Sequence, residues 1–183
     1  MLALAYREAA EVLARGGLVA YPTEGVWGLG CDPRNPAAVG ALLAAKQRPV
    51  DKGLILISDH FEALEAWITL PSRSALKRAF ESWPGPTTWL FPARSDAPDW
   101  ITGESDRIAI RVTNHPVAAR LCKAWGEALV STSANRNGLP PADGATAVRR
   151  QFPKVLDYLV PGALGGLGRP STIRDVRSGQ QVR

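Results

Sequence analysis

Short apolar runs alternate along the chain with segments in which apolar residues recur every three or four positions. The apolar runs predict buried β-strands at residues 18–21, 54–57, 87–92, 107–112, 128–131, 158–160 and 171–174. The longer repeats predict helices near residues 6–15, 36–48, 61–67, 72–80, 114–125 and 146–151. Because a continuously apolar strand must be covered on both faces, the alternation predicts an α/β fold.

Turn-forming and capping residues mark where several of these elements should end. Gly16-Gly17 terminates the first predicted helix, and Asn35 can cap the second. Residues 87–92 and 107–112 follow one another in a hairpin-like pattern, which favours a mixed parallel and antiparallel sheet. No linker, repeat or low-complexity tract interrupts the chain, so we expect one domain over residues 1–183.

Composition is typical of a globular protein. Of the 183 residues 45% are hydrophobic and 21% charged, and no apolar run reaches the roughly 18 residues that a transmembrane helix needs. The first residues lack the basic and apolar regions of an export signal. Two cysteines and two histidines argue against a disulfide scaffold or a protein-held metal. We therefore expect a cytoplasmic protein without a membrane partner.

Positive charge is concentrated in the second half of the chain. Residues 1–106 carry 10 Lys and Arg against 13 Asp and Glu, a balance of −3, whereas residues 107–183 carry 12 against 4, a balance of +8. Arginine supplies 17 of the 22 cations, and its planar fork suits phosphates and carboxylates. A GC-rich genome explains that ratio equally well, but the asymmetry itself indicates an anionic ligand such as a nucleotide or RNA.

A glycine-rich segment follows the first predicted strand. Residues 22–30, Pro-Thr-Glu-Gly-Val-Trp-Gly-Leu-Gly, place Thr23 and Glu24 where the backbone can approach a ligand closely. The order of the glycines is not that of a dinucleotide fingerprint. An irregular loop packed beneath Trp27 is the alternative interpretation.

A second segment, residues 46–52, brings three cations together. Lys46 continues the apolar stripe of the preceding helix, and Pro49 favours extended geometry at Arg48. Lys46 and Arg48, two positions apart in extended chain, then point toward one anion, with Lys52 close behind. Interaction with the helix dipole, about 0.3–1 kcal/mol per cation, is the alternative explanation.

A third segment, residues 131–135, reads Ser-Thr-Ser-Ala-Asn at the end of a predicted strand. Alternation places Ser131, Ser133 and Asn135 on one side, where hydroxyl and amide groups can bind a phosphate, a ribose or a metal-bound oxygen. A turn with locally satisfied side chains is the alternative. Because the sequence contains neither a P-loop nor a Gly-x-Ser-x-Gly motif, these patterns indicate an anion site without naming a reaction.

Several blocks of sequence, taken in order, resemble the YrdC/TsaC family. They are Tyr21–Asp32, Ala45–Pro49, Trp83–Thr88, Ile110–Val112, Ser131–Asn135 and Gly168–Ile173. Each block is weak alone, but together they span nearly the whole chain. Residues 46–57 are particularly similar to the short bacterial form of the family.

The resemblance implies threonylcarbamoyl-AMP synthase activity, in which L-threonine, bicarbonate and ATP give threonylcarbamoyl-adenylate, pyrophosphate and water. It implies Mg²⁺ as the companion of ATP, and a tRNA threonylcarbamoyl-transferase complex that consumes the product. It also implies tRNA or double-stranded RNA as a partner. The implied fold is a twisted mixed sheet with flanking helices around a positively charged cavity.

The resemblance also implies roles for individual residues. The expected catalytic and ATP-binding set, matching the family's Lys-x-Arg and Ser-x-Asn pairs, is Lys46, Arg48, Ser133 and Asn135. Further expected ATP contacts are Lys52, Thr88 and Arg183. The expected threonine contacts are Thr23, Arg111, Ser131 and Ser171.

The chain departs from longer family members in two ways. Lys52-Gly53 replaces an Asn-Pro, so Lys52 is expected to take over a phosphate contact. The second domain of those members has no counterpart here, so closure over the product is expected from loops of this domain or from partner proteins.

Two other functions compete with the synthase. An RNA-binding or ribosome-maturation factor without catalysis would use the basic second half, but residues 136–154 lack an interleaved aromatic array. A carbamoyltransferase of hydrogenase maturation shares the domain but needs zinc-finger cysteines, which this sequence does not contain.

Overall fold

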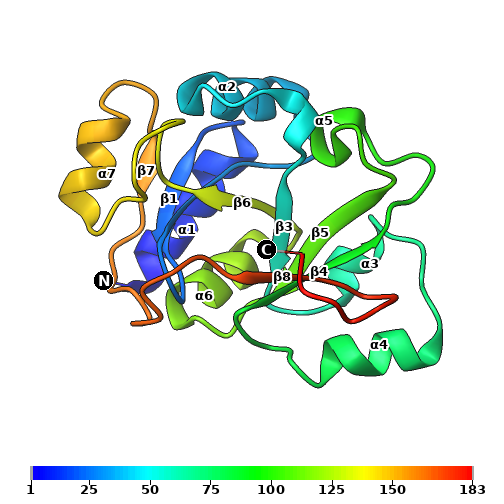
Figure 1. The fold of residues 1–183 in the computed structure, drawn as a ribbon. Helices are drawn as coiled ribbons and strands as arrows, with labels where there is room; N and C mark the ends of the chain where they lie inside the picture. The colour runs from blue at the N-terminus through cyan, green and yellow to red at the C-terminus, as the bar shows by residue number, and fades with distance from the viewer. Residues whose placement is uncertain (1, 183) are drawn as a thin grey trace.

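The computed structural model describes residues 2–182 and contains an eight-stranded sheet with helices packed around it (Figure 1). The strands are β1 (Val19–Pro22), β2 (Trp27–Gly30), β3 (Ile55–Ser58), β4 (Thr87–Pro92), β5 (Arg107–Val112), β6 (Leu129–Ser133), β7 (Tyr158–Leu159) and β8 (Thr172–Asp175). Their order is β7-β1-β2-β6-β3-β5-β4-β8. The pairs β1–β7, β3–β5 and β4–β8 are parallel and the other neighbours antiparallel. The predicted mixed α/β sheet is therefore confirmed.

Seven α-helices and one 3₁₀-helix are found within residues 2–182. They are α1 (Leu2–Ala14), α2 (Pro36–Lys46), η1 (Val50–Lys52), α3 (Glu62–Glu65), α4 (Arg73–Phe80), α5 (Asp99–Thr102), α6 (Pro116–Trp125) and α7 (Ala145–Gln151). Figure 1 shows α1 and α6 together behind the sheet, with α2 and α5 along one end. No helix in this part of the chain is both long and apolar enough to cross a membrane.

Alternate residues of the central strands feed two separate apolar cores. On β1, Val19 and Tyr21 belong to the core that α1 and α6 cover, whereas Ala20 belongs to the core on the other face. On β3, Ile57 and Leu56 divide in the same way. This two-residue period is what a sheet covered on both faces requires.

Strand β2 lies in the glycine-rich segment after β1, where no strand was predicted from the sequence. A Cβ at Gly30 would overlap the carbonyl oxygen of Val130, and one at Gly28 would lie 3.1 Å from the Tyr21 ring. The two glycines therefore let the antiparallel β1–β2 pair form with Tyr21 lying across it. Glycine is unfavourable in strands, so the sequence alone argues against a strand at this position. The glycines are explained only by the close approach of the neighbouring strand and of the Tyr21 ring.

Helix starts were predicted well at α2 and less well at α6. The Asn35 side chain accepts hydrogen bonds from the backbone N–H groups of Ala37 and Ala38, at 3.0 and 3.1 Å, as its sequence position predicted. Helix α6, however, begins at Pro116 after a cap formed by His115 rather than at residue 114. The imidazole Nδ1 accepts the backbone N–H of Ala118 at 3.5 Å, so His115 precedes the helix as its cap.

Candidate active site

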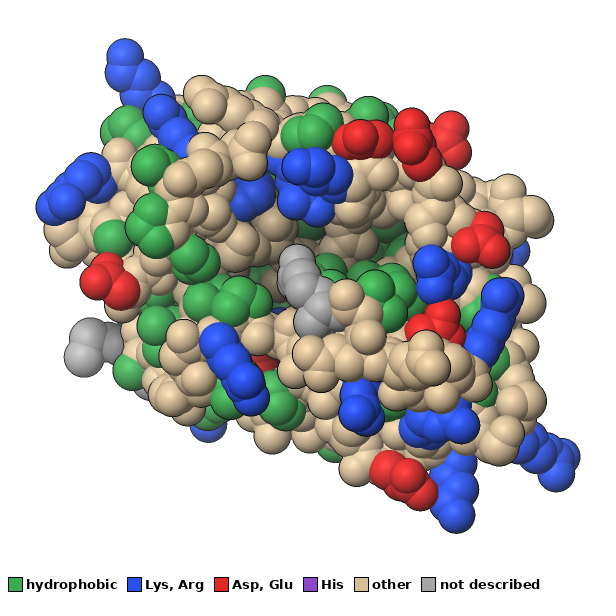
Figure 2. All heavy atoms as spheres, in the orientation of Figure 1, with side chains coloured by type: hydrophobic (Ala, Val, Ile, Leu, Met, Phe, Trp, Pro, Cys, Tyr) green, Lys and Arg blue, Asp and Glu red, His purple; other side chains and the backbone are tan. Residues whose placement is uncertain are grey.

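A cavity of about 320 Å³ lies on the same sheet face as the core that α1 and α6 cover, beyond the part of that face that the helices reach. Figure 2 shows the hollow in the middle of the molecule, with Lys and Arg side chains on its rim and apolar side chains along its walls. On β5, Arg107, Ala109 and Arg111 line the cavity, whereas Ile108 and Ile110 between them are buried in the opposite core. The strand period thus delivers polar and charged groups to one side only.

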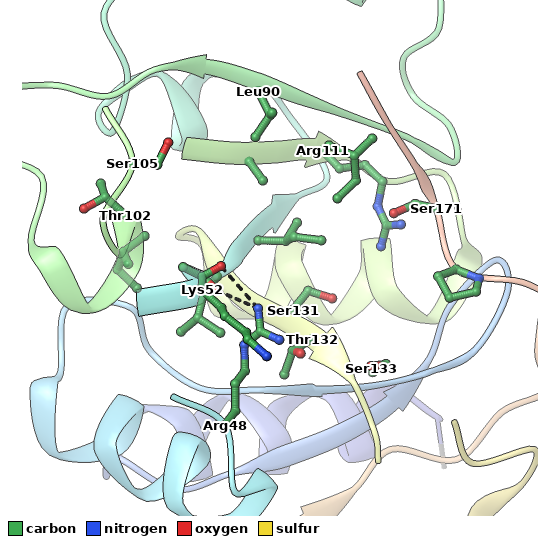
Figure 3. A pocket seen from close by; sticks show the side chains of 18 of the residues that line it. Arg48, Lys52, Leu90, Thr102, Ser105, Arg111, Ser131, Thr132, Ser133 and Ser171 are labelled. Atoms are coloured by element: carbon green, nitrogen blue, oxygen red, sulfur yellow. Dashed lines mark hydrogen bonds between the residues drawn. The ribbon is translucent and has the colours of Figure 1, made fainter. Parts of the chain in front are cut away.

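The floor of the cavity continues the apolar face beneath α6. On β6, Leu129 packs against the helices, whereas Ser131 and Ser133, two and four residues later, line the cavity together with Thr132. The strand therefore changes from apolar to hydroxyl side chains where helical cover ends. Figure 3 shows these three hydroxyl residues following one another along the strand beside the cavity.

The basic end of the cavity is built where α2 ends. Gln47 adopts a left-handed conformation with φ of 54°, the only positive φ of a non-glycine residue in the described chain. Its N–H donates to Ala44 O, and the N–H of Arg48 donates to Leu43 O, both at 3.0 Å. The prediction of an extended Lys46–Arg48 step was therefore wrong, because the chain reverses through a left-handed cap instead.

Lys46 joins the end of α2 to the end of β6. Its side chain is 4% exposed, and Nζ donates to the backbone carbonyls of Ser133 and of Asn135, the latter at 2.7 Å. Burial, and then the nearby positive charge of Arg48, lower the pKa of Lys46 to about 8. The two segments picked out from the sequence thus meet, although the ammonium binds main-chain oxygens and does not line the cavity.

Arg48 and Lys52 line the cavity at this basic end. The Arg48 Nη2 donates to the carbonyl oxygens of Lys52 and Gly53, at 3.3 and 2.9 Å, and these bonds are dashed in Figure 3. Asn135 faces elsewhere, because its Nδ2 donates to Leu139 O at 2.7 Å. Of the four residues expected to form the catalytic set, Arg48 and Ser133 therefore line the cavity, and Lys46 and Asn135 support it from behind.

The expected threonine contacts gather at the other end. Thr23, Arg111, Ser131 and Ser171 all line the cavity. Thr88 is fully buried and does not line it; its hydroxyl lies 2.9 Å from the hydroxyl of Ser171, so it reaches the cavity only through that residue. Arg183, the remaining expected ATP contact, lies outside the described residues.

A buried polar group behind Arg111 was not predicted from the sequence. Glu24 Oε2 lies 3.7 Å from Arg111 Nη2, and the hydroxyl of Thr113 donates to Glu24 Oε1 at 2.6 Å. His115 adjoins them, and burial lowers the pKa of its imidazole. Glu24 lies in a segment that the sequence had singled out, and Thr113 directly follows a predicted strand. Sequence position could therefore have drawn attention to each residue, but their contact across 89 residues of sequence could not be predicted.

The donor set of the cavity suits an anion and not a cation. Among the described residues that line it are three arginines and a lysine with several hydroxyls, and no carboxylate. Within residues 2–182 no group of three His, Cys, Asp or Glu side chains is placed to hold a metal ion. Hydroxyl groups and guanidinium forks are the partners that phosphates and carboxylates prefer in proteins.

Fold and site together define an α/β protein with a basic, hydroxyl-lined cavity for an anionic ligand. The Sua5/YciO/YrdC family model, which carries the description "Telomere recombination", matches residues 11–183. The chain therefore belongs to the Sua5/YciO/YrdC family.

Named relatives are similar over nearly their full length. The chain is 51% identical over 177 residues to a threonylcarbamoyl-AMP synthase of Nitrosococcus oceani, covering 97% of this chain and 96% of the relative. It is 55% identical over 178 residues to one of Halorhodospira halophila, covering 97% and 93%. Among solved structures, P. abyssi Sua5 complexed with L-threonine matches with a TM-score of 0.89 and 33% identity. That match covers 96% of this chain but 52% of the Sua5 chain.

Proposed function

We propose that this protein is a threonylcarbamoyl-AMP synthase, which converts L-threonine, bicarbonate and ATP into threonylcarbamoyl-adenylate, pyrophosphate and water. The observation that carries the proposal is one cavity with a cationic end at Arg48 and Lys52 and a hydroxyl- and arginine-lined end at Arg111. Relatives of that name at 51% and 55% identity, and the threonine complex of Sua5, support it.

The reaction makes demands that this cavity meets. The threonine amine attacks the bicarbonate carbon, and loss of water leaves a carbamate. A carbamate oxygen then attacks the α-phosphorus of ATP, and the bond from that phosphorus to pyrophosphate breaks. Because an anion attacks a polyanion, charge neutralisation and alignment matter more than proton abstraction, and cationic and hydroxyl groups supply both.

We assign the residue roles by their place in the cavity. Arg48 and Lys52 contact the phosphates, and Ser133 orients them. Lys46 acts from behind by holding the main chain at Ser133 and Asn135. The proposed contacts of the amino acid are Thr23, Arg111, Ser131 and Ser171, with Thr88 supporting Ser171. Arg183 keeps its proposed ATP contact.

The partners follow from the same proposal. Mg²⁺ would accompany the triphosphate as its counter-ion and, when bound, would screen the phosphate charge. The product is passed to a tRNA threonylcarbamoyl-transferase complex, with tRNA or double-stranded RNA bound by the basic second half. The proposed compartment is the cytoplasm, and the single sheet supports one domain.

Pyrophosphate release from ATP by the purified protein tests the proposal directly. We expect release that requires both L-threonine and bicarbonate, and formation of threonylcarbamoyl-adenylate detected by mass spectrometry. Omitting either co-substrate should abolish both signals. A folded protein that binds RNA but makes no adenylate under these conditions would establish the competing RNA-binding function instead.

A further inference from the structure

Half of the buried polar residues within the described chain cluster at one end of the cavity, in its lining or directly behind it. The ten buried polar or charged residues include Thr23, Glu24, Arg111, Thr113 and His115, each 2–8% exposed. Removing such groups from water is costly unless each finds a partner. Their concentration at one end of the cavity therefore indicates that these buried polar groups serve a function other than packing.

Glu24 lies at the centre of this group. One carboxylate oxygen accepts the short hydrogen bond from the Thr113 hydroxyl, and the other faces the Arg111 guanidinium. The hydroxyl of Thr113 in turn accepts the backbone N–H of His115 at 3.2 Å, so the start of α6 fixes the direction of the Thr113 donor. The orientation of the Glu24 carboxylate is thus set from the side away from the cavity.

Arg111 is held by charge and not by a closed hydrogen-bonded pair. Its separation of 3.7 Å from Glu24 exceeds hydrogen-bond range, and both Arg111 Nε and Glu24 Oε2 are buried without a hydrogen-bond partner. Figure 3 shows the guanidinium pointing into the cavity beside Ser171. The carboxylate therefore compensates the charge of Arg111 while leaving its N–H groups for a ligand.

The backbone of Glu24 also helps to hold the opposite wall of the cavity. The backbone carbonyl of Glu24 accepts the N–H of Leu167 at 2.9 Å, and that of Thr23 accepts the N–H of Gly165 at 3.0 Å. These bonds anchor the strap, residues 162–171, which carries Ser171 into the cavity. Glu24 thus reaches one cavity wall through its side chain and the other through its main chain.

We infer that Glu24 is a positioning residue for the amino-acid substrate: through Arg111 it fixes where the substrate carboxylate binds. The inference rests on the proposed function, since it takes Arg111 as a contact of threonine. Without the charge of Glu24, the guanidinium keeps its positive charge but loses the group that orients it. Threonine binding then weakens, whereas ATP, held at the other end, is affected little.

The test compares Glu24→Gln with Glu127→Gln in pyrophosphate-release kinetics and L-threonine calorimetry. Glu127 also pairs with an arginine, at 3.4 Å from Arg34, but the pair is exposed and lies outside the cavity. Glu24→Gln should raise the KM and Kd for L-threonine about tenfold or more, because it removes one member of a buried charge pair. The KM for ATP should change less than about twofold, and Glu127→Gln should match wild type.

Two further variants keep the test decisive if Glu24→Gln does not fold. Thr113→Val removes the hydroxyl that orients Glu24 and should raise the threonine KM in the same direction, whereas Thr113→Ser retains it and should restore the wild-type value. Equal threonine KM values in all folded variants, with an active wild type, overturn this inference alone. A wild-type protein that neither binds threonine nor makes the adenylate overturns the proposed function with it.

Discussion

The two ends of the cavity hold their cations in different ways. At the basic end, Arg48 and Lys52 line the cavity side by side, and Arg48 donates to two backbone carbonyls. At the amino-acid end, Arg111 is buried and faces Glu24. Two neighbouring cations attract a polyanion from solution, whereas a buried arginine that faces a carboxylate selects a single carboxylate by geometry.

The two ends also differ in how the chain assembles them. The basic end is local, because one chain reversal after α2 supplies residues 46–53. The amino-acid end gathers Thr23, Arg111 and Ser171 from three distant parts of the sequence. Damage to the basic end should therefore reduce function without unfolding the protein, whereas damage to the amino-acid end should affect binding and stability together.

Arg48→Ala tests the basic end and carries the largest expected effect. Losing a preorganised cation at the phosphates should lower kcat/KM for ATP by about 100-fold or more while the thermal midpoint stays within a few degrees. The kcat/KM of Arg48→Lys should lie between those of the wild type and Arg48→Ala, because lysine keeps the positive charge but lacks the planar guanidinium group. Steady-state kinetics and thermal melts measure both quantities.

Arg34→Ala is the matched control, because Arg34 is an exposed arginine outside this cavity. It should leave the kinetics unchanged. A catalytically normal Arg48→Ala protein would show that charge at the basic end is not what the reaction uses.

Gly25→Ala tests the amino-acid end with a smaller effect. A Cβ at Gly25 would overlap the backbone carbonyl oxygen of Arg169, so the strap must move away. We expect a loss of about 1–3 kcal/mol in unfolding free energy, typical of overpacking, and a larger rise in the KM for threonine than in that for ATP. Chemical denaturation and kinetics give the two readouts.

Gly40→Ala is the control for this substitution. No atom lies within 4 Å of a Cβ at Gly40, which is in helix α2, so alanine there should stabilise the protein by about 0.5–1 kcal/mol. Equal KM values for threonine in Gly25→Ala and wild type would show that the position of the strap does not affect amino-acid binding.

The sequence predicted features that depend on local pattern and missed those that depend on distant neighbours. Strands β4 and β5 were predicted to the residue, because each contains a short apolar run. Strand β2 was missed, since its glycines make sense only against Tyr21 and Val130. The left-handed cap at Gln47 was missed because any residue but glycine is unexpected there.

The candidate site divides in the same way. Short sequence motifs contain Lys46, Arg48 and Ser133, so the sequence alone identified these three residues as candidates. The pairing of Glu24 with Arg111 and Thr113 depends on how β1 and β5 are placed by the whole sheet. Burial, which decides that Lys46 faces carbonyl oxygens and not the cavity, is likewise a property of the finished fold.

The titration of Lys46 gives the smallest effect and tests how the basic end is anchored. Burial lowers its pKa from 10.5 to about 8, so between these values the unfolded chain binds a proton that the folded protein has lost. Stability then rises with pH, by up to about 1.4 kcal/mol per pH unit. Burial raises the pKa of Cys31 to about 12, which acts in the opposite sense above pH 9.

Comparison with Lys46→Met isolates this contribution, because the cysteines are common to both proteins. From pH 7.5 to 9.5 the wild type should gain about 1–2 kcal/mol of unfolding free energy relative to the variant, measured by urea denaturation. Parallel pH curves would mean that the pKa of Lys46 is not lowered in the folded protein. The hydrogen bonds from its ammonium to Ser133 and Asn135 would then offset the cost of burial in full.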